Sequence, residues 1–283
     1  MRLLDAVSDP GWGRPNEDSW GHRGHVAWVV DGATGVADEA LVSTSTDARW
    51  LAVHASAALS RHARNRDDVT ALVRAAIVDV ARRFDVQARR SPRHRFERPT
   101  ASLVVARAEA ATLAIASLGD CTAAVLDAAG LYTAIAPCPR WADGEKQEAA
   151  RVIALRPDAL SCGVVDLLPE GLLEARRFRS SHNMPGGYWI FGLDPEAASH
   201  AVVARVPVTL PAVVLLMSDG FAAISERYGF YAPRELLQRA VRSGLEGIVA
   251  ELRKIESRVD PDGSRFPRSK RSDDASAVLL ALD

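Results

Sequence analysis

The amino-acid sequence predicts an α+β protein in which antiparallel β-sheets are combined with α-helices. Short β-rich segments and amphipathic helical segments alternate in blocks, with few strand–helix–strand units of the kind that builds a parallel sheet. No linker rich in Pro, Gly or Ser divides the sequence, so we interpret residues 1–283 as a single domain. The chain is 48% hydrophobic and 25% charged, which excludes a mainly disordered or collagen-like protein.

One strand and two helices are expected in the first third of the chain. Residues 26–30 form a β-rich run that stops at Asp31. Residues 43–64 place apolar side chains at helical spacing and have Ser and Thr near their start as capping candidates. Residues 67–86 carry Val, Leu and Ile on one helical face, and the Arg-rich segment after them is expected to be a polar loop.

The middle of the chain changes to a β pattern. Short apolar runs separated by turn residues, as in an antiparallel meander, occupy residues 101–106, 112–117 and 122–126. A helix is expected around residues 145–154. The remainder of the segment 137–200 is rich in Pro and Gly loops, and its role stays open.

The last third predicts strands and helices in turn. Strands are expected at residues 202–208 and 213–217 and helices at residues 233–242 and 245–258. A closing strand is expected at residues 277–282.

Charge and hydropathy exclude several classes of function. Lys and Arg number 35 against 36 Asp and Glu, a formal charge of -1, so no nucleic-acid partner is expected. No segment approaches the roughly 20 apolar residues that a membrane span needs, and the start of the chain lacks the apolar core of a signal peptide. We therefore expect a cytoplasmic protein without a membrane partner. The three cysteines have no CxxC spacing, so neither a disulfide framework nor a zinc site is indicated.

Acidic residues recur where a β-rich run ends or begins. They are Asp31, Asp120, Asp219, Asp273 and Asp274, with Glu17 and Asp18 early in the chain. A carboxylate at such a position points out of the core from a rigid base, and a following Gly allows close approach of a ligand. Several converging carboxylates repel one another unless a cation lies between them. Hard divalent ions such as Mg²⁺ or Mn²⁺ suit an all-oxygen site of this kind.

Each acidic motif also has an ordinary structural interpretation. An isolated Asp-Gly after a strand is more often a turn than a metal ligand, and an isolated Glu-Asp pair is usually solvated surface. The order of the whole set along the chain is what favours a functional site.

The ordered motifs resemble those of a known family. They are Asn16-Glu17-Asp18, Val30-Asp31-Gly32-Ala33-Thr34-Gly35, Pro99-Thr100-Ala101-Ser102, Leu118-Gly119-Asp120-Cys121, Leu216-Met217-Ser218-Asp219-Gly220 and Ser272-Asp273-Asp274-Ala275-Ser276. The set resembles the metal-dependent protein serine/threonine phosphatases of type 2C, the PPM family, in its bacterial form. The motifs span residues 11–276, nearly the whole chain.

The resemblance implies a sandwich of two antiparallel β-sheets flanked by α-helices, with two Mn²⁺ or Mg²⁺ ions at one end. By motif, Asp31 would bridge both ions and the Gly32 carbonyl would bind one of them. Asp219 and Asp273 would complete the other, each partly through water. Catalysis is therefore assigned to Asp31, Asp219 and Asp273.

The resemblance assigns further residues beside these. Glu17 and Asp18 lie in the acidic motif that binds metal directly or through water. Arg14 is the candidate for holding the substrate phosphate, because a guanidinium group can bind phosphate in a bidentate manner. The family usually places that Arg one residue further from the Glu.

The sequence departs from the family pattern at several positions. Ala33 stands where the family often has His or Met, and Thr34 where it often has Gly. Asp120 resembles an acid that can help to bind a third metal, but Ala223 stands where its usual partner acid would be. A third metal is therefore doubtful, and Asp120 is equally compatible with a supporting role. Cys121 is expected to be a small buried residue rather than a nucleophile.

The implied function is hydrolysis of phosphoserine and phosphothreonine by attack of a water molecule activated by the two metal ions. The substrate would be a phosphorylated protein, the product of an unidentified Ser/Thr kinase. Two alternatives remain open at this point. One is a catalytically impaired pseudophosphatase that binds phosphoprotein, and the other is a two-metal hydrolase of small phosphate esters.

Two basic runs precede motifs of this set. Residues 89–98 come before Thr100, and residues 265–271 come before Asp273. They are hypothesised to line the approach to the site and to favour acidic phosphopeptides. The alternative is that both are solvated loops.

Overall fold

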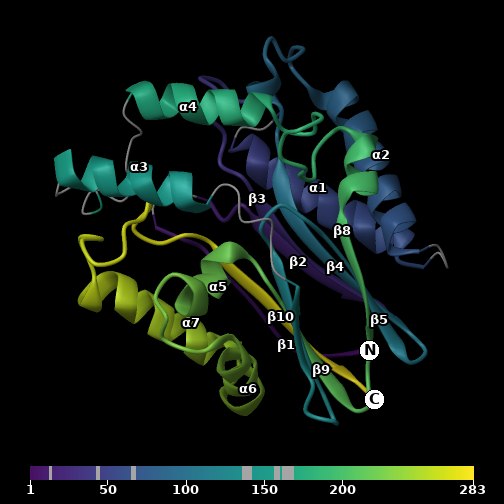
Figure 1. The fold of residues 1–283 in the computed structure, drawn as a ribbon. Helices are drawn as coiled ribbons and strands as arrows, with labels where there is room; N and C mark the ends of the chain where they lie inside the picture. Colours follow the sequence, from purple (N-terminus) through teal and green to yellow (C-terminus); the bar gives the residue numbers. More distant parts are fainter. Residues whose placement is uncertain (13–14, 43–44, 65–67, 136–141, 156–159, 161–168) are drawn as a thin grey trace.

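The protein is a sandwich of two five-stranded antiparallel sheets with helices on both outer faces (Figure 1). The computed structural model describes residues 1–12, 15–42, 45–64, 68–135, 142–155, 160 and 169–283. The first sheet has the strand order β1-β10-β9-β6-β7 and the second the order β2-β3-β4-β5-β8. The α+β class and the two-sheet arrangement are thereby confirmed.

Every neighbouring pair of strands is antiparallel. The first sheet consists of β1 (Arg2–Asp9), β10 (Ala275–Leu282), β9 (Ala212–Met217), β6 (Thr122–Asp127) and β7 (Tyr132–Ile135). The second consists of β2 (Asp18–Arg23), β3 (Val26–Gly32), β4 (Ala101–Glu109), β5 (Thr112–Leu118) and β8 (Val202–Pro207). Every strand predicted from an apolar run is present, with bounds that differ by one to three residues.

Helices cover the two outer faces and one end of the sandwich (Figure 1). Helices α1 (Asp47–His62) and α2 (Val69–Gln87) pack on the second sheet, and α5 (Asp219–Glu226), α6 (Pro233–Ser243) and α7 (Leu245–Lys254) pack on the first. Helices α3 (Ala142–Leu155) and α4 (Pro169–Ser180) lie at the end of the sandwich opposite the two termini. No described helix is long and apolar enough to cross a bilayer.

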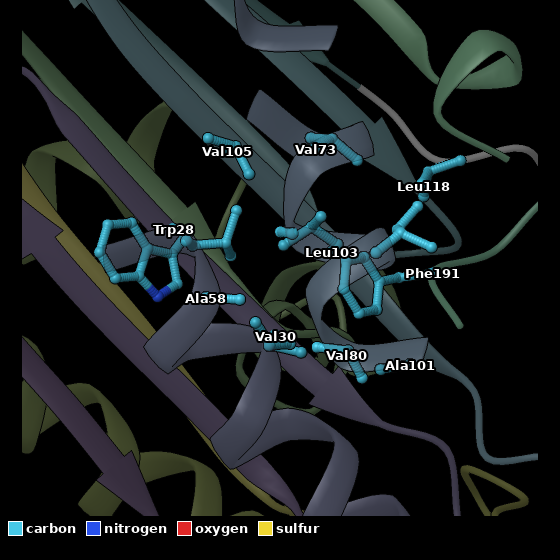
Figure 2. Packing of buried hydrophobic residues seen from close by; sticks show 14 of the residues in the cluster. Trp28, Val30, Ala58, Val73, Val80, Ala101, Leu103, Val105, Leu118 and Phe191 are labelled. Carbon is cyan, nitrogen blue, oxygen red and sulfur yellow. The ribbon is translucent and has the colours of Figure 1, made fainter. Parts of the chain in front are cut away.

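The side chains of β3, which point alternately to the two faces of its sheet, show why the sandwich forms. Val26, Trp28 and Val30 pack against α1 and α2, as Figure 2 shows for Trp28 and Val30. Ala27 and Val29 point the other way and join the cluster between the sheets. Successive side chains of a strand face opposite sides, so a strand that is apolar throughout requires cover on both faces.

Several elements do not show in the sequence pattern. Strands β1 and β2 are edge strands with many half-buried polar residues, so they lack the apolar run that identifies a buried strand. Helix α5 has eight residues, with Gly220 in its first turn, and α4 begins directly after residues that lie outside the described ranges. The expected helix 245–258 ends as an α-helix at Lys254, and Ile255–Val259 form a wider π-helical turn.

A buried ion pair fixes the loop before β10. The Arg268 Nη1 atom donates to Asp260 Oδ2 at 2.6 Å, and both side chains are 1% exposed. Arg268 also donates to the backbone carbonyls of Glu256 and Arg271. The hypothesis that the run 265–271 lines an approach to the site is therefore wrong for Arg268, which is a structural residue.

We expect Arg268→Met to lower the free energy of unfolding by about 3 kcal/mol, because it leaves the Asp260 carboxylate buried without its cation. Urea denaturation followed by circular dichroism measures the change. Arg258→Met is the matched control, since Arg258 is exposed and should change stability by less than about 0.5 kcal/mol. Equal stability of the two variants would contradict the assignment.

Candidate active site

The strand directions bring the predicted acids to one end of the sandwich. Strand β3 ends at Gly32, and β2 begins at Asp18, which pairs directly with Asp31. In the other sheet β9 ends at Met217, two residues before Asp219, and β10 begins at Ala275, directly after the Asp273-Asp274 pair. Met217 and Ala277 are paired across these two strands. Carboxylates from both sheets therefore meet at the end opposite the chain termini (Figure 1).

The electrostatics confirm that these carboxylates are neighbours. Burial raises the pKa of Asp31 well above its ordinary value, and nearby carboxylates raise it further. The neighbours responsible are Asp18, Asp219, Asp120 and Asp273. Burial likewise raises the pKa of Asp219, with Asp120 and Asp273 as its closest negative neighbours. Four of the predicted site residues thus form one electrostatic group with Asp120.

Asp18 is strongly affected by this environment. Its side chain is buried, and burial together with the Asp274 and Asp273 carboxylates raises its pKa to about 7. Neither of its carboxylate oxygens has a hydrogen-bond partner among the described residues, and the same holds for Glu17 Oε1. Buried carboxylate oxygens without a donor are unfavourable unless a cation or a proton is supplied.

Thr34 supports the other half of the Glu17 carboxylate. The Thr34 hydroxyl donates to Glu17 Oε2 at 2.5 Å. The departure from the family pattern at this position therefore has a structural consequence: a Gly there has no hydroxyl, whereas Thr34 orients the Glu17 side chain.

Lys270 provides a positive charge within the group. Its Nζ atom donates to Asp273 Oδ1 at 2.6 Å. Burial alone would raise the pKa of Asp273, but the Lys270 ammonium group holds it below its ordinary value. The contact with Lys270 therefore favours the charged form of Asp273. Sequence reasoning did not identify Lys270, although a Lys three residues before a predicted ligand is a signal that could have been used.

Asp274 has a role different from that of Asp273. Its two carboxylate oxygens accept hydrogen bonds from the backbone N–H groups of Gly11 and Glu17, each at 2.6 Å. It thus fastens the segment that carries Glu17 to the start of β10. Gly220 lies against the same backbone, because a Cβ atom there would come within 1.9 Å of the Asp274 carbonyl oxygen.

The remaining predicted residues differ in how far the structure places them. Asp120 lies in the turn after β5, where its backbone N–H donates to Ser102 Oγ at 3.2 Å. Cys121 is fully buried and burial raises the pKa of its thiol, so it stays protonated near neutral pH. Arg14, the candidate for holding phosphate, lies outside the described residues.

The donor set fits divalent cations of the hard type. All the converging groups offer oxygen, and three buried carboxylate oxygens have no hydrogen-bond donor in the part of the chain that the structure describes. Within the described ranges no three His, Cys, Asp or Glu side chains are arranged to hold one ion by themselves. Mg²⁺ usually keeps several waters and takes only one or two carboxylates, so ions bound partly through water remain compatible with this arrangement.

We expect the metal-free protein in EDTA to lose stability as pH rises from about 4 to about 7. The raised pKa of Asp18 means that the folded state binds its proton more tightly than the unfolded state does, and this advantage disappears above the folded pKa. One such proton contributes a slope of up to about 1.4 kcal/mol per pH unit. Asp18→Asn should flatten this dependence, as measured by guanidinium denaturation at pH 5, 6 and 7. Asp85→Asn, a change at an exposed position of α2, should leave the slope unchanged. Equal slopes for all three proteins would refute the assignment.

Comparisons with known proteins agree with this architecture. No protein-family model matches the sequence, and no curated protein matches it. The solved structures do give matches. The Mycobacterium tuberculosis serine/threonine phosphatase PstP/Ppp is 16% identical, with all of both chains covered and a TM-score of 0.58. The photosystem II phosphatase PBCP is 16% identical, with 99% and 98% of the two chains covered and a TM-score of 0.56.

A third match contains metal. The catalytic domain of PstP in complex with two manganese ions is 17% identical, with 98% of this chain and 97% of that chain covered and a TM-score of 0.51. At such identities the likeness establishes the three-dimensional arrangement and not the activity. This protein has the fold of the type 2C serine/threonine phosphatases.

Proposed function

We propose that the protein is a metal-dependent phosphatase that hydrolyses phosphoserine and phosphothreonine in proteins. The observation that carries this proposal is the convergence of Asp31, Asp219 and Asp273 from both sheets at one end of the sandwich. The manganese complex of a structural neighbour supports it, since that protein has the same fold and holds two ions.

Several residues of the chain would together hold the cations. Asp31, the Gly32 carbonyl, Asp219 and Asp273 would hold two Mn²⁺ or Mg²⁺ ions. Glu17 and Asp18 would contribute through the buried oxygens for which the described residues offer no donor. When bound, the ions supply positive charge that activates a water molecule and stabilises the phosphoryl oxygens.

Each protein group then has a defined task. Lys270 keeps Asp273 charged, and Thr34 holds Glu17 in one orientation. Asp274 holds the backbone at Gly11 and at Glu17. Arg14, which lies between them in the sequence, is the residue proposed to grip the substrate phosphate. Ala33 supplies no acid for the leaving group, so that proton must come from water or from another group.

The first test is hydrolysis of p-nitrophenyl phosphate and of a phosphothreonine peptide with Mn²⁺, with Mg²⁺ and with EDTA. We expect metal-dependent turnover, and we expect Asp219→Asn to lower kcat/KM by at least about 100-fold. Removing a residue that only hydrogen-bonds to a metal ligand typically lowers activity 10–100-fold, and removing a carboxylate that itself holds the ions should lower it more. Asp85→Asn removes the same charge from the surface of α2 and should leave kcat/KM unchanged.

The outcomes separate the alternatives. Turnover that EDTA and Asp219→Asn leave intact would contradict the proposal. A folded protein whose melting temperature rises with Mn²⁺ but that turns over neither substrate would indicate a pseudophosphatase. A strong preference for the small ester over the peptide would indicate a hydrolase of small phosphate esters.

A further inference from the structure

A second polar pocket lies next to the acidic site, on the far side of residues 33–34. It is formed between the end of α4, the segment 95–100 and the segment 182–194. Three arginines line it, Arg95, Arg98 and Arg179. The enclosed part of the pocket has room for little more than a water molecule, but its mouth is partly open to solvent, and the Arg95 and Arg98 side chains are 38% and 31% exposed. A ligand could therefore approach the guanidinium groups from outside.

The pocket has an excess of positive charge. Among the described residues its lining contains one carboxylate, Asp194, which pairs with Arg95 at 3.3 Å and with Arg98 at 2.9 Å. Three guanidinium groups thus face a single negative charge. The Arg95 Nε atom is buried and has no hydrogen-bond partner among the described residues. The N–H group at Nε therefore donates to none of the described protein atoms, whereas the Nη2 atom of Arg95 donates to the His182 carbonyl and to Asp194.

His182 adds a second unsatisfied group to the pocket wall. Its side chain is 4% exposed, and neither ring nitrogen has a hydrogen-bond partner in the described part of the chain. Burial lowers its pKa to about 3, and the charges of Arg179 and Arg95 act in the same direction. The ring is neutral near pH 7, so one of its nitrogens carries a proton that it can donate.

Arg179 connects this pocket to the acidic site. Its guanidinium group donates to Thr100 Oγ1 at 2.8 Å and to the Thr34 carbonyl oxygen at 3.1 Å. Thr34 is three residues after Asp31, so their Cα atoms are at most about 11 Å apart. An extended peptide covers about 3.3–3.6 Å per residue, so a group two to four residues from the reacting phosphoresidue can reach the pocket.

We propose that this pocket binds a second phosphoryl group of a multiply phosphorylated protein substrate, two to four residues from the phosphoresidue that is hydrolysed. Arginines bind phosphoryl oxygens with charge-assisted, bidentate hydrogen bonds, which fits the excess of guanidinium groups and the unused donors. The inference rests on the proposed phosphatase function. It also gives a specific role to the first basic run, through Arg95 and Arg98.

The test compares peptides that carry nonhydrolysable phosphonate analogues of phosphothreonine. One peptide has two analogues three residues apart, and two others have a single analogue at either position. Fluorescence anisotropy in Mn²⁺ gives the dissociation constants. We expect the doubly modified peptide to bind about tenfold more tightly than either singly modified peptide. If only one site bound phosphoryl groups, the second analogue would raise the affinity by a statistical factor of about two.

The variants locate the effect. Arg98→Gln and Arg95→Gln each leave Asp194 paired with the other arginine, so neither creates an unpaired carboxylate. Each should reduce the tenfold gain to about twofold. Arg93→Gln removes a charge from the same basic run at an exposed position that does not line the pocket, and it should retain the full gain.

Three results would overturn the proposal. They are an equal affinity of the wild-type protein for all three peptides, a gain that both pocket variants retain, and an equal gain when Glu replaces the second analogue. Turnover of an ordinary phosphothreonine peptide is measured separately. A protein that hydrolyses nothing but keeps the tenfold gain would contradict the catalytic function and still support the pocket.

Discussion

The mutual repulsion of buried carboxylates is the constraint on which this structure depends. Asp18, Asp31 and Asp219 all have pKa values raised by burial and by neighbouring carboxylates, so the fold opposes their ionisation near neutral pH. Such a group is destabilising unless cations or protons compensate for it. The group lies at an end of the sandwich, where strands from both sheets deliver side chains beyond the apolar layer. The core between the sheets is formed by a cluster of apolar residues that includes Val29 and Leu216.

The acids stay together because separate contacts restrain the segments that carry them. Asp274 uses both oxygens to hold the backbone at Gly11 and Glu17. The Gly32 N–H donates to the Glu17 carbonyl oxygen at 3.1 Å, which joins β3 to the same segment. Lys270 neutralises one charge of the group. Asp274 and Lys270 therefore act on the residues proposed to hold the cations, Asp274 through the backbone and Lys270 through the Asp273 carboxylate.

The sequence predicts elements and residues that are marked by a local pattern. It does not predict features that depend on tertiary contacts. Apolar runs such as residues 213–217 predict the buried strands because such a run requires cover on both faces. The edge strand Asp18–Arg23 was missed because its residues are half-buried and mostly polar. The acids were found because they stand at ends of predicted strands. The different tasks of Asp273 and Asp274 could not be predicted, since neighbouring residues with the same side chain are distinguished only by their partners.

Thr34 shows how a departure from a family pattern can acquire a function of its own. Its hydroxyl donates to Glu17 in the acidic group, and its carbonyl accepts from Arg179 in the wall of the second pocket. A Gly at this position would retain the carbonyl contact and lose the contact with Glu17. Through its hydroxyl and its carbonyl, Thr34 therefore contacts both the acidic group and the arginine-lined pocket.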